Sequence, residues 1–102
     1  MSRGFAAQSE IEADVQRLAQ ALAPDVVRIR YSLGDDWTGD PSLFLKILLT
    51  DEASRPENLY GVVQRVPLAV MKEIDGDDLG LHLYWDFRSL SEQEELLDPA
   101  WA

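Results

Sequence analysis

The sequence predicts an α+β domain in which two helices cover one face of a three-stranded sheet. Two segments place apolar residues at helical spacing, and three others alternate apolar and polar residues. The order is helix, strand, strand, helix, strand, with an optional short helix at the C-terminal end. The first two strands form an antiparallel hairpin, and a right-handed crossover through the second helix sets the third strand parallel to the second. The expected architecture is a two-layer sandwich with one open sheet face.

The first predicted helix begins at a capping box formed by Ser9 and Glu12. It carries a single apolar stripe made of Ile11, Val15, Leu18 and Leu22. Residues 1–8 precede this pattern and are expected to form a flexible arm. The α+β domain then covers residues 9–90.

Two strands are predicted to form the hairpin, over residues 26–33 and 43–50. In the first, alternate residues share a face: Val27, Ile29, Tyr31 and Leu33. In the second, the corresponding set is Leu43, Leu45, Ile47 and Leu49. The residues between them, 34–41, have the composition of a turn.

The second helix is predicted to begin at a capping box of Ser54 and Glu57. Pro67 lies inside its apolar stripe, and an interior proline predicts a kink or break near Val66. Residues 75–78 are expected to be a turn. The third strand follows, and its alternating apolar residues are Leu81, Leu83, Trp85 and Phe87.

The charge of the chain restricts its partners. The formal net charge is −10, and most of it lies from residue 73 onward, where nine carboxylates face a single arginine. These carboxylates are Glu73, Asp75, Asp77, Asp78, Asp86, Glu92, Glu94, Glu95 and Asp98. Such a field disfavours nucleic acid and anionic membranes and attracts basic protein surfaces. The absence of cysteine excludes thiol chemistry and is typical of a reducing cytoplasm.

The turn after the first strand is the first candidate site. It contains Asp35, Asp36, Trp37 and Asp40. Tryptophan is enriched at binding hot spots, so we expect Trp37 to anchor a partner while the aspartates attract it. Two alternatives remain: Trp37 folds back over the core, or Asp35, Asp36 and Asp40 hold a cation.

The C-terminal segment, residues 91–102, is the second candidate. It combines Glu94 and Glu95 with Leu97 and Trp101, a composition suited to docking in a basic-rimmed groove. The alternative is a short helix, capped by Ser91 and Glu94, that packs on its own domain.

No catalytic motif is recognisable, and the protein is not expected to be an enzyme or to need a cofactor. His82 is the only histidine and lacks a partner designated by the sequence. Asp75, Asp77 and Asp78 match a calcium loop only in part, which makes them a weak alternative cation site.

The preferred hypothesis is a small acidic cytoplasmic module that binds a basic protein, as an antitoxin, an inhibitor or an accessory subunit does. The alternatives are a cation-responsive regulatory domain and a structural homodimer formed through the open sheet face.

Overall fold

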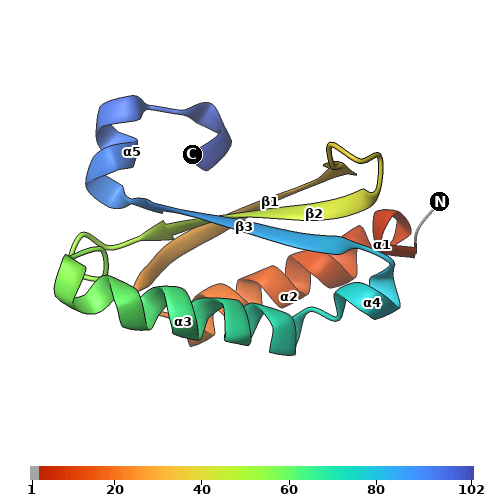
Figure 1. Ribbon diagram of the computed structural model, residues 1–102, viewed down its shortest axis with the longest axis horizontal. Helices are drawn as coiled ribbons and strands as arrows, with labels where there is room; N and C mark the ends of the chain where they lie inside the picture. Colours follow the sequence, from red (N-terminus) through yellow and green to blue (C-terminus); the bar gives the residue numbers. More distant parts are fainter. Residues whose placement is uncertain (1–2) are drawn as a thin grey trace.

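The computed structural model describes residues 3–102 and has the predicted α+β architecture (Figure 1). The predicted order of helices and strands is confirmed, and three short helices are added to it. The elements are α1 (Arg3–Ala6), α2 (Gln8–Ala21), β1 (Val26–Asp35), β2 (Pro41–Leu49), α3 (Pro56–Glu73), α4 (Gly76–Leu79), β3 (His82–Ser89), α5 (Leu90–Leu96) and the 3-10 helix η1 (Pro99–Trp101).

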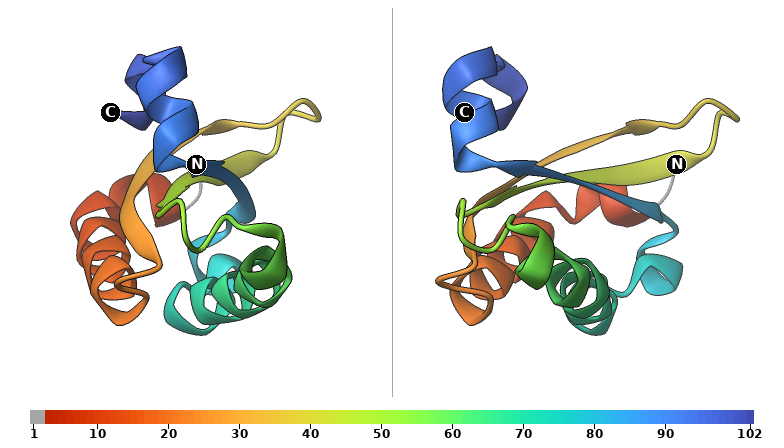
Figure 2. Two further views of the ribbon diagram at one scale, coloured as in Figure 1. Left: turned by 90° about the vertical axis from the view of Figure 1, so that its left-hand side faces the viewer. Right: turned by 60° about the vertical axis from the view of Figure 1, so that its left-hand side comes forward.

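The sheet has the order β1-β2-β3. β1 pairs antiparallel with β2, and β2 pairs parallel with β3, as a hairpin and a crossover through α3 require. Both long helices, α2 and α3, lie beneath the same face of the sheet (Figures 1 and 2). The predicted inward residues of β2 are each at most 1% exposed, and they are Leu43, Leu45, Ile47 and Leu49. The core therefore lies between the sheet and these two helices.

The first strand departs from the predicted alternation at Val27. A bulge between Val26 and Arg28 inserts one residue, and such an insertion shifts the side chains before it to the opposite face. Val26 is therefore buried, and Val27 is 41% exposed. From Ile29 onward the predicted alternation holds, with Ile29 in the core.

The predicted capping boxes of the two long helices are wrong. α2 begins after Ala7 and α3 begins after Arg55, and neither N-cap residue forms a side-chain capping bond. Ser54 instead donates its hydroxyl to the backbone oxygen of Thr50. Serine hydroxyls have several local acceptors, so the Ser-x-x-Glu spacing alone does not determine where a helix starts.

Helix α3 continues through Pro67, where a kink or break was predicted. An interior proline removes one backbone hydrogen bond and costs about 3 kcal/mol. Val66 and Val70 on either side are completely buried. Burial of this helix face offsets the local cost, so tertiary packing keeps the helix continuous.

Residues 3–6, which were expected to belong to a flexible arm, form helix α1. Gly4 is buried so closely that a Cβ atom there would lie 2.3 Å from Leu81 Cδ1, and Phe5 packs against the core. Met1 and Ser2, the beginning of the expected arm, lie outside the described residues. Residues 75–78 were expected to be a turn. Asp75 is instead the N-cap of the single-turn helix α4, which covers Gly76–Leu79.

The C-terminal segment packs on the sheet face opposite α2 and α3 (Figures 1 and 2). Helix α5 begins with a capping box of Ser89 and Glu92, two residues before the predicted one at Ser91. Ser91 instead donates its backbone N–H to Asp51. Leu48 points away from the core and is still only 1% exposed. The open face is therefore covered at the end of the sheet where this segment lies.

Candidate protein-binding face

The loop between β1 and β2 is held by the side chain of Asp36. Its Oδ1 atom accepts hydrogen bonds from Thr38 N at 2.9 Å, Thr38 Oγ1 at 2.6 Å and Asp40 N at 3.1 Å. The backbone adds a bond from Asp36 N to Asp40 O and one from Gly39 N to Asp36 O. Gly39 has a φ of 87°, which favours glycine. These bonds give the loop one defined conformation.

Trp37 lies at the tip of this loop and is 82% exposed. The alternative in which it folds back over the core is therefore wrong. Its ring centroid is 5.4 Å from that of Tyr84, and the Tyr84 ring stacks on Phe44 at the same distance. Tyr84 and Phe44 are paired neighbours on β3 and β2. Together the three rings form an aromatic cluster, which we define as Trp37, Phe44 and Tyr84, on the uncovered part of the sheet.

A hydrogen bond from the Tyr84 hydroxyl to Asp36 Oδ2, 2.8 Å long, joins the loop to β3. The Thr38 hydroxyl bond is the largest influence that lowers the pKa of Asp36, and the Tyr84 bond contributes as well. The same Asp36–Tyr84 bond is the largest influence that raises the pKa of Tyr84. The ionised carboxylate of Asp36 is thus part of the structure that positions Trp37.

The lowered pKa of Asp36 predicts a loss of stability in acid. Because the folded-state pKa lies below the ordinary value of 3.8, the stabilisation is fully present above that value and is lost as the pH falls through the folded-state pKa. The free energy of unfolding, measured by denaturant titration between pH 2 and 6, is expected to be higher for the parent than for Asp36→Asn at pH 6. This difference should shrink below about pH 4. A difference in the free energy of unfolding that stays constant with pH would contradict a stabilising role for the ionised Asp36 carboxylate.

His82 also has a partner that the sequence did not designate. Its Nε2 atom lies 3.3 Å from Asp40 Oδ2, and both side chains are more than half exposed. Beside this pair, a cavity of about 320 Å³ lies between the loop and α4. Asp40 and Asp77 both line it, with His82 at the edge of the sheet. Two acidic segments that are 37 positions apart in sequence therefore meet at one cavity.

The C-terminal candidates divide into exposed and buried residues. Glu94, Glu95 and Leu97 are exposed on or just after α5. The expectation that Trp101 anchors a partner is contradicted by its burial, because only 3% of it is exposed. The Arg88 guanidinium lies 4.4 Å from the centroid of the Trp101 ring, and Arg88 Nη1 donates to Gln93 Oε1 at 2.8 Å. Trp101 therefore packs the C-terminal segment against the sheet of the same chain.

The two predicted groups of binding residues are not brought together. The loop with Asp35, Trp37 and Asp40 and the segment with α5 lie at opposite ends of the sheet (Figure 1). The longest dimension of the molecule is 40 Å. The loop end is the better candidate site because its exposed tryptophan, aromatic cluster and carboxylates are contiguous.

The cation alternative has a different composition from the predicted one. Within residues 3–102, Asp36, Asp40 and His82 place one ligand atom each within 4.8 Å of one another. Asp35 is not in this group. Asp75, Asp77 and Asp78 do not form such a group either, and Asp75 Oδ1 accepts a hydrogen bond from Asp78 N as the cap of α4. Asp36 already accepts hydrogen bonds at both oxygens, so a cation would compete with the bonds that shape the loop.

Comparisons with protein-family models, curated proteins and solved structures found no match. None of the helices in the described part of the chain combines the length and apolar character needed to cross a membrane.

Proposed function

We propose that this protein is a small acidic module that binds a basic protein through the Trp37 loop. The observation that carries the proposal is the 82% exposure of Trp37 on a loop fixed by the hydrogen bonds of Asp36. Exposed tryptophan is unfavourable in water and is enriched at binding hot spots. A loop ordered before binding also loses less conformational entropy when it meets its partner.

The chemistry around Trp37 favours cationic side chains. The aromatic cluster offers ring faces for cation–π contact, and exposed Asp35 and Asp40 offer carboxylates. The cavity between Asp40 and Asp77 has room for the end of a lysine or arginine side chain. The net charge of −10 would accelerate encounter with a basic partner.

An antitoxin, an inhibitor or an accessory subunit would use a face of this kind. Glu94, Glu95 and Leu97 lie outside the proposed contact, and the carboxylates of Glu94 and Glu95 contribute to the field that attracts the partner. A cytoplasmic location belongs to the same proposal, and it is supported by the absence of cysteine.

Two alternatives are less well supported. In the first alternative, a cation-responsive domain, the metal would have to displace hydrogen bonds that Asp36 accepts. Those hydrogen bonds already order the loop. The homodimer alternative requires a broad open sheet face, and the C-terminal segment reduces that face by packing on one end of it. Each alternative makes its own prediction. A cation-responsive domain would release or absorb heat in a calorimetric titration with divalent cations, and a homodimer would be detected by light scattering.

The test compares tagged parent protein with Trp37→Ala and a matched control, Tyr60→Ala, in capture from the host lysate. Tyr60 is 73% exposed on α3, so its loss removes an aromatic side chain from another surface. A basic protein is expected with the parent and the control and should be lost with Trp37→Ala. For the purified pair, Trp37→Ala should raise the Kd by about 30-fold or more, as for a hot spot of at least 2 kcal/mol.

Salt provides the second readout. The affinity of the purified pair should fall as salt is added, and this dependence should flatten in the Asp35→Asn, Asp40→Asn variant. Equal capture by Trp37→Ala and the parent would overturn the proposal, as would an affinity that does not respond to salt.

A further inference from the structure

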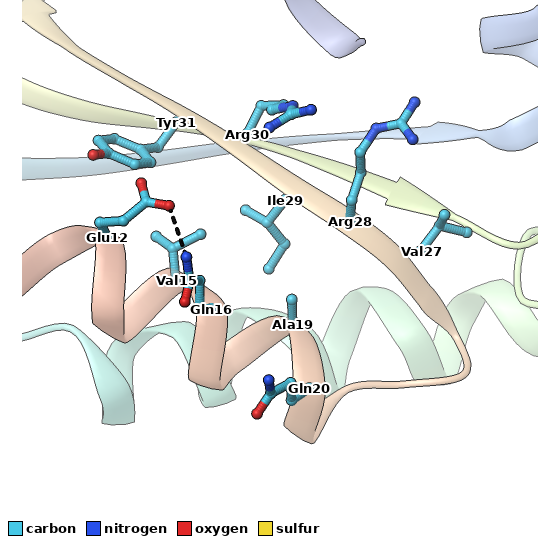
Figure 3. Close-up of a pocket in the computed structure, with 10 residues that line it drawn as sticks. All are labelled: Glu12, Val15, Gln16, Ala19, Gln20, Val27, Arg28, Ile29, Arg30 and Tyr31. Atoms are coloured by element: carbon cyan, nitrogen blue, oxygen red, sulfur yellow. Dashed lines mark hydrogen bonds between the residues drawn. The ribbon is translucent and has the colours of Figure 1, made fainter.

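A groove of about 610 Å³ runs between β1 and α2, on the side of the molecule away from β2 and β3 (Figure 3). Glu12, Gln16 and Gln20 line it from the helix, and residues 27–31 line it from the strand. Figure 3 shows the Ile29 side chain directed toward α2, with Val15 and Ala19 on the helix below. The groove thus has an apolar floor and a polar helical wall.

The strand that borders this groove is an edge strand. β2 pairs with β1 on one side only, because the sheet order is β1-β2-β3. In an edge strand, every second residue directs its backbone N–H and C=O away from the sheet. Those groups can pair with another extended chain, which would then form a fourth strand beside α2.

The bulge at the start of β1 adds to the groove. It leaves Val27 41% exposed, and this side chain lines the groove together with the floor residues. A strand paired with β1 would direct alternate side chains toward this apolar surface and the others to the opposite face of the sheet.

Positive charge dominates β1 on that opposite face. Arg28 and Arg30 project from β1 on the side away from α2 (Figure 3). Arg28 Nε donates to Trp101 O at 3.2 Å, and Arg30 Nη2 donates to Ala102 O at 2.8 Å. Each bond uses one of the five N–H donors of a guanidinium, so both arginines retain donors for a carboxylate.

These arginines decide between two occupants of the groove. A second copy of the chain, paired antiparallel about Ile29, would place Arg28 beside Arg30 of the copy twice. Like charges opposite one another in a sheet are destabilising, and such charges are a common protection of edge strands. A strand with carboxylates at these positions would instead be stabilised.

We propose that the groove binds an extended peptide segment of another protein, in which apolar residues that face α2 alternate with acidic residues that face Arg28 and Arg30. The segment adds to β1 as a fourth strand. This site is separate from the Trp37 loop and independent of the function proposed for that loop.

The test is an amide chemical-shift titration of the ¹⁵N-labelled protein with a synthetic peptide, acetyl-Glu-Val-Glu-Val-Glu-Val-amide. Shifts are expected in residues 26–33 and 12–20. A peptide with lysine in place of glutamate should bind about tenfold more weakly, because two cross-strand charge pairs change sign. A peptide of the same composition with all glutamates first should not produce these shifts.

A paired set of variants locates the contact. Gln16→Trp fills the groove from an exposed helix position, and Gln64→Trp makes the same change on the exposed surface of α3. The titration should be abolished by Gln16→Trp and retained by Gln64→Trp. Absence of shifts at millimolar peptide, equal binding by both variants, or equal binding of the lysine peptide would each overturn the proposal. Sedimentation that shows a dimer lost in Gln16→Trp would overturn it in favour of a second copy.

Discussion

Replacement of Trp101 by alanine is expected to lower the free energy of unfolding by about 3–5 kcal/mol, the usual range for a buried aromatic residue. Only 3% of Trp101 is exposed, and its ring lies against the Arg88 guanidinium. The change also removes the ring that lies against Arg88, and Arg88 is the strand partner of the buried Leu48. The measurement is chemical denaturation, with hydrogen exchange to follow α5.

The matched control is Trp37→Ala, which removes the same side chain from a position that is 82% exposed. It should change the free energy of unfolding by no more than about 0.5 kcal/mol. Hydrogen exchange should show lost protection in α5 for Trp101→Ala alone. Equal stability of the two variants would mean that the C-terminal segment does not pack on the sheet as described.

Replacement of Arg88 by alanine is expected to lower the free energy of unfolding by about 2–4 kcal/mol. Arg88 Nη1 donates to Gln93 Oε1 at 2.8 Å, and the same atom lies 3.5 Å from Asp98 Oδ2. Gln93 is only 7% exposed, so loss of its donor leaves a buried amide oxygen without that hydrogen bond. The Trp101 ring also loses its cation–π contact. Chemical denaturation measures the loss.

Lysine at position 88 serves as the informative control. It keeps the positive charge but not the planar guanidinium, which stacks on Trp101 and directs an N–H to Gln93. Arg88→Lys should therefore recover less than half of the stability lost in Arg88→Ala. Full recovery would show that charge alone, rather than guanidinium geometry, attaches the segment.

The elements that the sequence predicts well are those with a long, regular apolar pattern. The stripe of α2 and the alternation of β2 are both found buried, because each pattern has only one orientation that removes its apolar residues from water. The hairpin and the parallel third strand follow from connection length and handedness. These features need no knowledge of distant contacts.

Structural features were predicted less well where a local sequence signal is compatible with several conformations. Serines at positions 54 and 91 fit the capping-box spacing, but their hydrogen-bond partners are Thr50 and Asp51. The bulge that exposes Val27 leaves no mark in an otherwise regular alternation. Ser54 has a local alternative acceptor four residues away, and Ser91 has a partner 40 residues away, so the capping-box spacing determines neither outcome.

Sequence alone determined the fold class, the acidic character and the choice of Trp37, Asp36 and Asp40 as a group. These properties depend on composition and on neighbours along the chain. Tertiary structure alone decided which tryptophan is exposed, because Trp37 and Trp101 have similar acidic surroundings in the sequence but different contacts in space. Tertiary structure also places Asp77 and His82 close to Asp40, because β3 pairs with β2 after the crossover through α3.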